Sequence, residues 1–492
     1  MSSNRLLLLL FLPAAFLVAC DARPQQPFDL DTTFRTVVDQ VYVSSILPLP
    51  DGGAVASGLM RFQGELDDKR LVRLLPNGQR DASFYNSGLG GGFLKPWANH
   101  FYVSTPHTVR RILPDGTQDP SFIGMNLGPY FSSLQGGDYH VYPDGRILMS
   151  GVHVLSDSIR GFEGLFCLIW FSNTGYLDTT KTHRTCAGSL DFFQELPNGQ
   201  FIGSGSTSTW DGQPASNIVR FEADGELDPT FQANVWWGQA YGFLPLADGR
   251  VYAVGKFRIT GISDTLNLVR FMPDGSLDPT FNNHLDFRIT EMTNLNEGPI
   301  LRGIRPLDEG QLVVTGQFEL IEGEARRNIC LIDTSGNLLN DYFSGPGCGN
   351  FVYQNDTVSS IGGIIPAPDG SYYIWGAYHG YDDGTTNDTL QRMVSRLYGL
   401  DVGVQEQLDV EDRMLKVWPN PARDQLHVQL PQGLRGGVLR VLDATGQVVQ
   451  EERFPAQVSS FSFPISDLPP GLYALELMDQ QAGRWLAKWV KE

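Results

Sequence analysis

A duplicated segment constrains the fold of this chain more than any other feature of its sequence. The segment VRFEADGELDPTF at Val219–Phe231 returns as VRFMPDGSLDPTF at Val269–Phe281. A catalytic motif normally occurs once, so a duplicated segment indicates a structural unit that is stacked. Looser copies occur elsewhere between residues 28 and 400. Their mean step of about 50 residues is typical of the blades of a propeller.

Each copy has the same internal order. Two apolar, β-rich runs flank Asp-Gly or Asn-Gly, the dipeptides that close tight hairpins. A glycine follows the second run, a third run comes next, and most copies end in Asp-x-x-Phe. This order predicts about four short antiparallel strands per unit, with the Phe as a wedge between neighbouring units worth about 2 to 3 kcal/mol if buried. The endings are at Phe34, Phe84, Phe122, Phe231, Phe281 and Phe343, with a degenerate one near Thr180, and the glycines are Gly58, Gly151, Gly205, Gly255, Gly316 and Gly376.

The two ends of the repeat region are complementary. There are seven first elements, and the seventh, from Ile364, stops in MVSRLYGL at 393–400 without its ending. The segment FDLDTTF at 28–34 is an ending with no unit before it. We therefore expect an all-β fold: a seven-bladed β-propeller over residues 21–400, closed by the N-terminal strand.

The alternation PDGxhhhxGxF with hxRhxPDGxLDPTF, where h is apolar, resembles the delta-60 repeat family of bacterial propeller-like proteins. The resemblance covers about residues 28–400. The second unit is compressed and the third and sixth endings depart from the pattern. The resemblance implies a fold and carries no established catalytic residues.

After Leu400 the repeat stops. Residues 401–413 are acidic and are predicted to be a linker. Short alternating runs with a different pattern then fill residues 414–492, which predicts a small Ig-like β-sandwich.

Four motifs in this region, VWPNPARDQLHV, LRVLDATGQVV, DLPPGLYALEL and the terminal KWVKE, occur in order. They resemble the type A C-terminal sorting domain of the Bacteroidetes type IX secretion system. The resemblance implies export to the cell surface or the extracellular space, with the secretion machinery and its sortase as partners and cleavage in the linker. The motif residues singled out are Pro419, Asn420, Pro421, Gly446, Gly471 and Tyr473.

The first twenty residues predict a signal peptide, because one Arg precedes an unbroken apolar run from Leu6 to Ala19. LVAC at 17–20 also resembles a lipobox, which implies lipidation of Cys20 and a membrane contact through a lipid anchor. The alternative is ordinary signal peptidase cleavage after Ala19 or Ala22.

Export makes the other cysteines candidates for disulfides. Cys167 with Cys186 and Cys330 with Cys348 form two local pairs, and each bond would close a loop of about 20 residues, worth about 3 kcal/mol. Four free buried thiols are the alternative. Neither pair has the CxxC spacing of zinc or redox sites.

Composition and motifs leave two functional hypotheses. The formal net charge of −19 makes nucleic acid an unfavourable partner. No nucleophile elbow, phosphate loop or close metal motif is present, and no cofactor or metal is expected. Trp236, Trp237 and Tyr241 are candidate ligand-binding residues, or else packing residues of a blade edge. The first hypothesis is a non-catalytic module that binds a glycan, peptide or protein. The second is an exported hydrolase or lyase acting on a polysaccharide or peptide, whose catalytic groups lie on separate blades.

Overall fold

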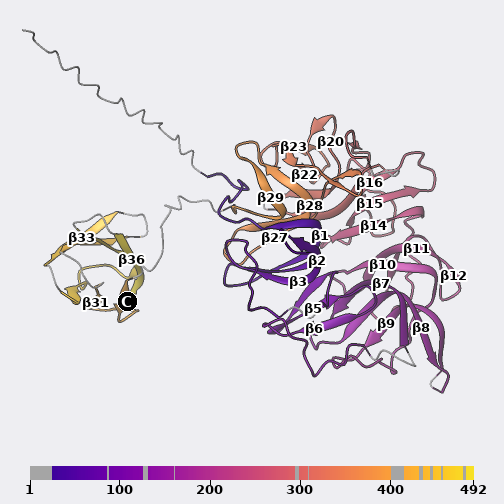
Figure 1. Cartoon of the computed structure of the whole chain (residues 1–492), viewed down its shortest axis with the longest axis horizontal. Coiled ribbons are helices and arrows are strands. Elements are labelled where there is room, and N and C mark those ends of the chain that lie inside the picture. The colour runs from indigo at the N-terminus through magenta and orange to yellow at the C-terminus, as the bar shows by residue number, and fades with distance from the viewer. Residues whose placement is uncertain are drawn as a thin grey trace, which may run out of the picture. The chain divides into compact units, whose positions relative to one another are not determined.

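Each repeat folds into one small antiparallel sheet (Figure 1). The computed structural model describes residues 25–400 except 86–87, 126–130, 160, 294–297 and 308–309, and residues 415–492 except 431–435, 444–446, 456–457 and 480–483. The chain divides into two compact units, Met1–Gly403 and Val404–Glu492. Within the described ranges every regular element is a strand, and none of them holds a helix that could cross a membrane.

Seven sheets follow one another in the first unit. They are β1 (Val38–Pro48), β2 (Ala54–Phe62) and β3 (Lys69–Leu74); β4 (Leu94–Trp97), β5 (His100–Ser104) and β6 (Val109–Ile112); β7 (Phe131–Val141), β8 (Ile147–Asp157) and β9 (Phe162–Phe171); β10 (Cys186–Glu195), β11 (Phe201–Trp210), β12 (Gln213–Pro214) and β13 (Ile218–Phe221); β14 (Val235–Pro245), β15 (Val251–Ile259) and β16 (Leu266–Phe271); β18 (Ile300–Pro306), β19 (Gln311–Gln317), β22 (Ile329–Asp333) and β23 (Leu338–Leu339); and β24 (Gly347–Cys348), β27 (Ser360–Pro366), β28 (Tyr372–Asp382) and β29 (Asn387–Leu397).

Two small sheets are added to the later blades. They are β17 (Phe287–Arg288) with β20 (Leu320–Ile321) and β21 (Glu324–Ala325), and the hairpin β25 (Phe351–Tyr353) with β26 (Asp356–Val358).

The turn residues form the hairpins as their chemistry predicts. In the fifth blade, Asp274 Oδ1 accepts the backbone N–H of Ser276 at 2.9 Å, and Gly275 has a φ of +86°. The fourth strand beyond this turn is reduced to a single bridge between Phe271 and Leu277. The predicted four strands per unit are therefore three full strands and a short outer segment.

The N-terminal segment supplies that outer segment to the seventh blade. Leu30 forms an antiparallel bridge with Leu397, and the N–H of Asp31 donates to the carbonyl of Arg396 at 2.9 Å. The Arg396 guanidinium returns a bond of 2.6 Å to the Asp31 carboxylate. The predicted closure of the last blade by residues 28–34 is confirmed.

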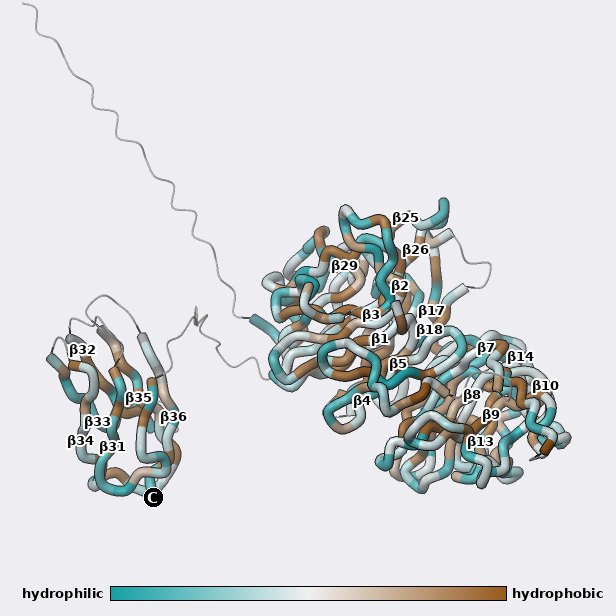
Figure 2. Tube along the Cα trace, turned by 60° about the horizontal axis from the view of Figure 1, so that its bottom comes forward, coloured by the Kyte–Doolittle hydropathy of each residue, from teal (hydrophilic) through white to brown (hydrophobic). Residues whose placement is uncertain are grey.

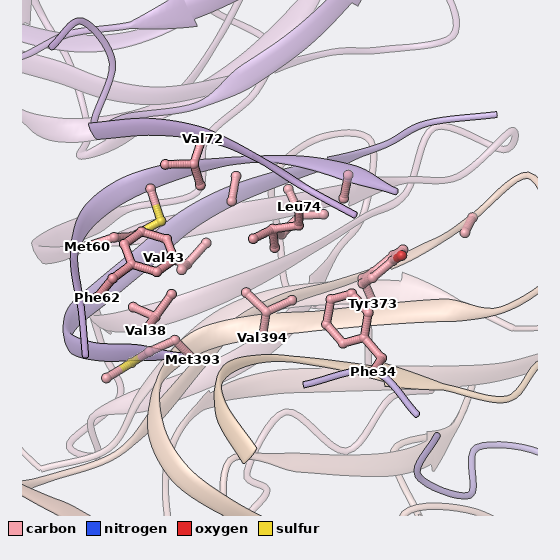
Figure 3. Packing of buried hydrophobic residues seen from close by; sticks show 14 of the residues in the cluster. Phe34, Val38, Val43, Met60, Phe62, Val72, Leu74, Tyr373, Met393 and Val394 are labelled. Carbon is pink, nitrogen blue, oxygen red and sulfur yellow. The ribbon is translucent and has the colours of Figure 1, made fainter. Parts of the chain in front are cut away.

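The first and seventh blades also pack against each other. The Trp375 indole N–H of β28 donates to the Ser44 carbonyl of β1, and the Tyr373 hydroxyl donates to the Gly52 carbonyl, both at 3.0 Å. Figure 3 shows Phe34 beside Tyr373 and Val394 in the hydrophobic cluster that the two blades share. Figure 1 shows β1 next to β27 and β28. The ring of blades is therefore closed.

Hydrophobic clusters fill all the junctions between neighbouring blades. Seven clusters occur in this unit, and each combines residues from two adjacent blades. Figure 2 shows the hydrophobic stretches running through the strands. Burying one such side chain stabilises the fold by about 1.5 to 3 kcal/mol. The predicted wedge residues lie in these clusters, as Phe34, Phe84, Phe122, Phe231, Phe281 and Phe343.

A recurrent glycine of the second strand permits a bulge in the first strand. A Cβ on Gly255 would lie 2.2 Å from the Gln239 carbonyl oxygen, and the register of β14 shifts at Tyr241. The same contact occurs between Gly316 and β18, where the register shifts at Arg302. A bulge redirects a side chain. The glycine therefore determines which side chain the facing first strand presents at the position of the bulge.

The second unit is a sandwich of two sheets. One sheet pairs β30 (Lys416–Trp418), β31 (Gln425–Gln429) and β34 (Ser460–Pro464), and the other pairs β33 (Val448–Phe454), β32 (Gly437–Leu442), β35 (Gly471–Asp479) and β36 (Arg484–Lys491). Its core includes Leu426, Val441, Leu475 and Trp489. The predicted β-sandwich is confirmed.

Candidate functional site

A groove of about 710 Å³ lies between the fourth and fifth blades. One wall is the hairpin of β11 and β12 with the segment that follows it, and the other is the connection from residue 227 to Trp236. The Trp236 side chain lines the groove and is 57% exposed. Exposed amide side chains of Gln213, Gln232 and Asn234 lie along the same surface. An open indole face beside neutral hydrogen-bonding groups is therefore available to a ligand.

The walls of the groove are held by hydrogen bonds between the two blades. The Ser216 hydroxyl accepts the Val235 N–H at 2.9 Å, and the Asn217 N–H donates to the Val235 carbonyl at 2.9 Å. The Asn217 amide also donates to the Gly238 carbonyl at 2.8 Å. These bonds place the backbone on both sides of Trp236 before any ligand arrives, which lowers the ordering cost of binding.

The groove is electrically neutral apart from one carboxylate. Among the described lining residues Asp228 is the one with a charged side chain, and it is 7% exposed. Its Oδ2 accepts the Arg220 Nε–H at 2.7 Å, and its Oδ1 accepts the Thr230 hydroxyl at 2.6 Å. These hydrogen bonds and the positive charge of Arg220 lower the pKa of Asp228 although burial raises it. Asp228 is thus an ionised structural residue rather than a free acid or base.

The three aromatic residues singled out in the sequence do not form one cluster. Trp236 lines the groove, whereas the Trp237 ring lies 5.3 Å from the Arg258 guanidinium and 5.7 Å from the Lys256 ammonium group. Tyr241 instead contacts the inner strands of both neighbouring blades. The register of β14 shifts at Trp236, which leaves Trp236 without a partner residue on β15 and places Trp237 opposite Arg258.

The four predicted disulfide cysteines are free thiols in the structure. Cys167 and Cys186 lie next to each other, and burial together with the neighbouring Cys186 thiol raises the pKa of Cys167. Their pairing stays a prediction.

Cys330 and Cys348 are buried free thiols that pack in two different hydrophobic clusters. Along β22 successive side chains face opposite sides, so Cys330 packs between the fifth and sixth blades while Cys348 packs between the sixth and seventh. Their pairing, like that of Cys167 and Cys186, stays a prediction.

The sorting-motif residues have structural roles. Asn420 Oδ1 accepts the Val490 N–H at 2.9 Å, so the turn at Pro419 and Pro421 is attached to the last strand of the chain. The Tyr473 ring stacks on Trp489 at 5.2 Å, and its hydroxyl donates to the Pro469 carbonyl at 2.8 Å. Two motifs distant in the sequence therefore meet.

Of the remaining motif residues and processing sites, only Gly471 lies within the described residues. Gly471 is exposed at the start of β35. Gly446, Cys20, the predicted signal peptide at 1–20 and the linker at 401–413 lie outside the described residues.

Sequence reasoning missed several residues that the fold brings together. Arg302 of β18 lies over the Tyr241 ring, 4.2 Å from its centroid, although sixty-one positions separate them. The recurrent glycines of the second strands mark the places where the first strands bulge. The first-strand residue opposite each glycine was therefore the signal in the sequence that could have indicated these positions. Over the described part of the chain, no group of three or more His, Cys, Asp or Glu side chains could hold a metal ion.

Comparison with known proteins finds one family match for the C-terminal unit and another for three of the propeller repeats. Residues 416–492 match the family model of the secretion system C-terminal sorting domain. Residues 416–492 are such a sorting domain. The protein is therefore exported to the cell surface or the extracellular space, as the motifs implied. Residues 49–84, 196–231 and 246–281 match a domain of unknown function, DUF5122, described as a β-propeller. Each of these matches ends on a wedge residue, which confirms the repeat.

Among the solved structures similar to the chain are proteins from Bacteroides species. The extracellular domain of a putative hybrid two-component system from B. thetaiotaomicron is 10% identical, with a TM-score of 0.42, over 94% of this chain and 59% of that chain. A protein of unknown function from Bacteroides caccae is 11% identical, with a TM-score of 0.30, over 58% of this chain and 92% of that chain.

A third similar structure is a DUF3244 family protein with an immunoglobulin-like β-sandwich fold from Bacteroides vulgatus. It is 25% identical, with a TM-score of 0.15, over 16% of this chain and 84% of that chain. The chain spans 59% and 60% of the length of the first two structures found. No curated protein matches it.

Proposed function

We propose that the propeller is a non-catalytic binding module for neutral carbohydrate, and that the groove at Trp236 is its binding site. The observation that carries this proposal is the exposed indole face beside uncharged amide and hydroxyl groups. Sugar rings present C–H faces that pack on indole, and hydroxyl groups that bond to amides. Few aromatic anchors normally supply most of the binding energy at such sites.

The groove supports binding better than catalysis. A glycosidase uses two carboxyl groups flanking the scissile bond. Among the described lining residues, the groove offers only Asp228, which is bound to Arg220 and Thr230. The alternative, an exported hydrolase or lyase, would need groups supplied from elsewhere on the ring.

The proposed route of delivery follows from the second unit. The sorting domain is recognised by the type IX secretion machinery, and a sortase cleaves it from the propeller in the linker at 401–413. The propeller then acts at the cell surface, with a signal peptide or a lipid on Cys20 serving the first export step.

The test is carbohydrate binding by the purified protein and its Trp236→Ala variant. Neutral oligosaccharides are screened on an array, and affinities are measured by calorimetry. We expect Trp236→Ala to weaken binding about tenfold or more, equivalent to about 1.4 kcal/mol. Trp237→Ala is the matched control and retains affinity, because its ring lies against Lys256 and Arg258.

Two results would contradict the proposal. Equal affinity of the wild type and Trp236→Ala would place the carbohydrate elsewhere. Release of new reducing ends or unsaturated products from a bound oligosaccharide would favour the hydrolase or lyase.

A further inference from the structure

A row of aromatic side chains runs along the inner strands of the ring. Phe93, just before β4, lies 6.2 Å from Phe192 of β10, and Phe192 lies 5.2 Å from Tyr241 of β14. These residues come from the second, fourth and fifth blades. The third blade contributes Gly136 and Gly137 to its inner strand, and no aromatic ring at that place. All three rings are partly exposed.

Arg302 continues the row on the sixth blade. Its guanidinium lies over Tyr241, and its side chain has no hydrogen bond or ion pair in the described part of the chain. Burial lowers the pKa of Arg302. Its nitrogen atoms are not among the sealed polar atoms without partners, so they remain open to solvent. A partly buried guanidinium without an anion is unfavourable.

Four arginines of the Asp-x-x-Phe junctions differ from Arg302 in this respect. Arg111, Arg220, Arg270 and Arg396 each contact an Asp carboxylate of the same repeat at 2.6 or 2.7 Å. Those arginines complete the fold. Arg302 instead lies where the register of β18 shifts, between Leu301 and Gly303.

We propose that Arg302, Tyr241 and Phe192 form a second binding site, for a carboxylate attached to an aromatic ring. The planar guanidinium fork matches a carboxylate in a bidentate geometry. The ring of the ligand packs on Tyr241 and Phe192, which prefer offset or edge-to-face contacts. This site is independent of the groove at Trp236, since it is made by different residues on the inner strands.

The chemistry has two sources, a free aromatic acid and the C-terminal carboxylate of a peptide that ends in an aromatic residue. Phenylacetate is the probe for the first source, and N-acetylphenylalanine is the probe for the second. Binding of either supports the site, and the tighter of the two identifies the source. The neutral amides of both probes are the chemical controls, because they keep the ring and remove the charge.

The experiment measures the affinity of the purified full chain for these probes by calorimetry or ligand-observed NMR. We expect Arg302→Met to weaken carboxylate binding about tenfold or more, and Arg302→Lys to weaken it less, because Lys keeps the charge and loses the fork. Arg305→Met, three positions along the same strand, is the matched control and keeps the affinity. Trp236→Ala also leaves phenylacetate binding unchanged.

Four outcomes would overturn the proposal. The first is that neither carboxylate binds, and the second is that acid and amide bind with equal affinity. The third is an equal loss of affinity in Arg302→Met and Arg305→Met. The fourth is a loss of phenylacetate affinity in Trp236→Ala. Circular dichroism of each variant separates a lost site from a lost fold. If Arg302→Met does not fold, Tyr241→Leu with Arg302→Lys gives the same comparison.

Discussion

At the scale of single residues, the duplicated segment is explained by one set of contacts. In the fifth blade Asp278 accepts the Arg270 Nε–H at 2.7 Å and the Thr280 hydroxyl at 2.7 Å. The Arg270 guanidinium lies 5.2 Å from the Phe281 ring and donates to the Thr334 carbonyl of the next blade at 2.6 Å. The Arg and the Asp-Pro-Thr-Phe ending of the duplicated segment thus form one junction between neighbouring blades.

The sixth blade shows how this junction can be replaced. Leu331 and Leu339 form the strand pair that Arg270 and Asp278 form in the fifth blade. Both members of the ion pair are exchanged for apolar residues together. Replacing only one partner would leave a buried charge uncompensated.

We predict that Asp278→Leu lowers the free energy of unfolding by about 3 to 5 kcal/mol, because it leaves Arg270 buried without its carboxylate. The double variant Asp278→Leu with Arg270→Leu should recover part of this loss. Urea unfolding followed by tryptophan fluorescence measures both. A double variant less stable than the single one would contradict the explanation.

A buried histidine predicts how stability depends on pH. His153 is fully buried, its Nε2 lies 2.9 Å from the Ser150 carbonyl oxygen, and burial lowers its pKa from 6.5 to about 4. The unfolded chain therefore takes up a proton near pH 6.5 that the folded chain takes up only near pH 4. Stability from the neutral imidazole is fully present above pH 6.5 and is lost as the pH falls toward 4.

We expect His153→Gln to reduce the slope of unfolding free energy against pH between 6.5 and 4. Urea unfolding at several pH values gives this slope. His284→Gln is the control, because the His284 side chain is exposed. An unchanged slope in His153→Gln would show that His153 does not contribute to the acid loss of stability.

At the scale of elements, closure of the ring depends on a short segment far from its partners in sequence. Leu30 bridges Leu397, and the Leu30 N–H donates to the Asp383 carboxylate at 2.7 Å. Phe28 is 3% exposed and contacts the Tyr342 and Tyr372 rings. The outer edge of the seventh blade is therefore covered by the beginning of the propeller.

Deletion of residues 25–34 should expose the edge of β29 and open the ring. We expect faster amide hydrogen exchange in β29 and β1, because β1 packs on the seventh blade, and a lower unfolding midpoint. A chain that starts at residue 25 is the control, since it keeps the closing segment. Unchanged exchange in β29 after the deletion would contradict this role.

At the scale of the whole molecule, the two units have separate cores and separate tasks. The sorting domain has its own hydrophobic cluster, and its terminal strand is held by the turn at Asn420. The propeller junctions contain no residue of that cluster. Each unit can therefore fold around its own core, and one can be removed without opening the other.

We predict that a chain without residues 415–492 folds but is not delivered to the cell surface. Fractionation of the source bacterium with an antibody to the propeller measures its location, and circular dichroism checks the fold. Asn420→Ala in the full chain tests the same step more gently, because it removes the bond to Val490. Normal surface delivery of the truncated chain would contradict the role of the sorting domain.

Much of the fold could be predicted because its signals are local. Asp-Gly turns, the glycine of the second strand and the Asp-x-x-Phe ending each act within a few residues, and their repetition gave the number of blades. The unmatched ending at 28–34 and the unmatched beginning near Ile364 predicted closure, since complementary ends of a repeat must meet. Loop insertions such as β25 and β26 carry no repeat and were not predicted.

The sequence by itself therefore determined the repeat, the closed ring and the sorting domain. Only the tertiary structure decided the candidate sites. Trp236 lines the groove while the adjacent Trp237 lies against Arg258, and the inner strands bring Tyr241 beside Arg302 from another blade. The physical reason is that a turn or a strand is encoded by neighbours in sequence, whereas a binding surface forms where side chains of different blades converge.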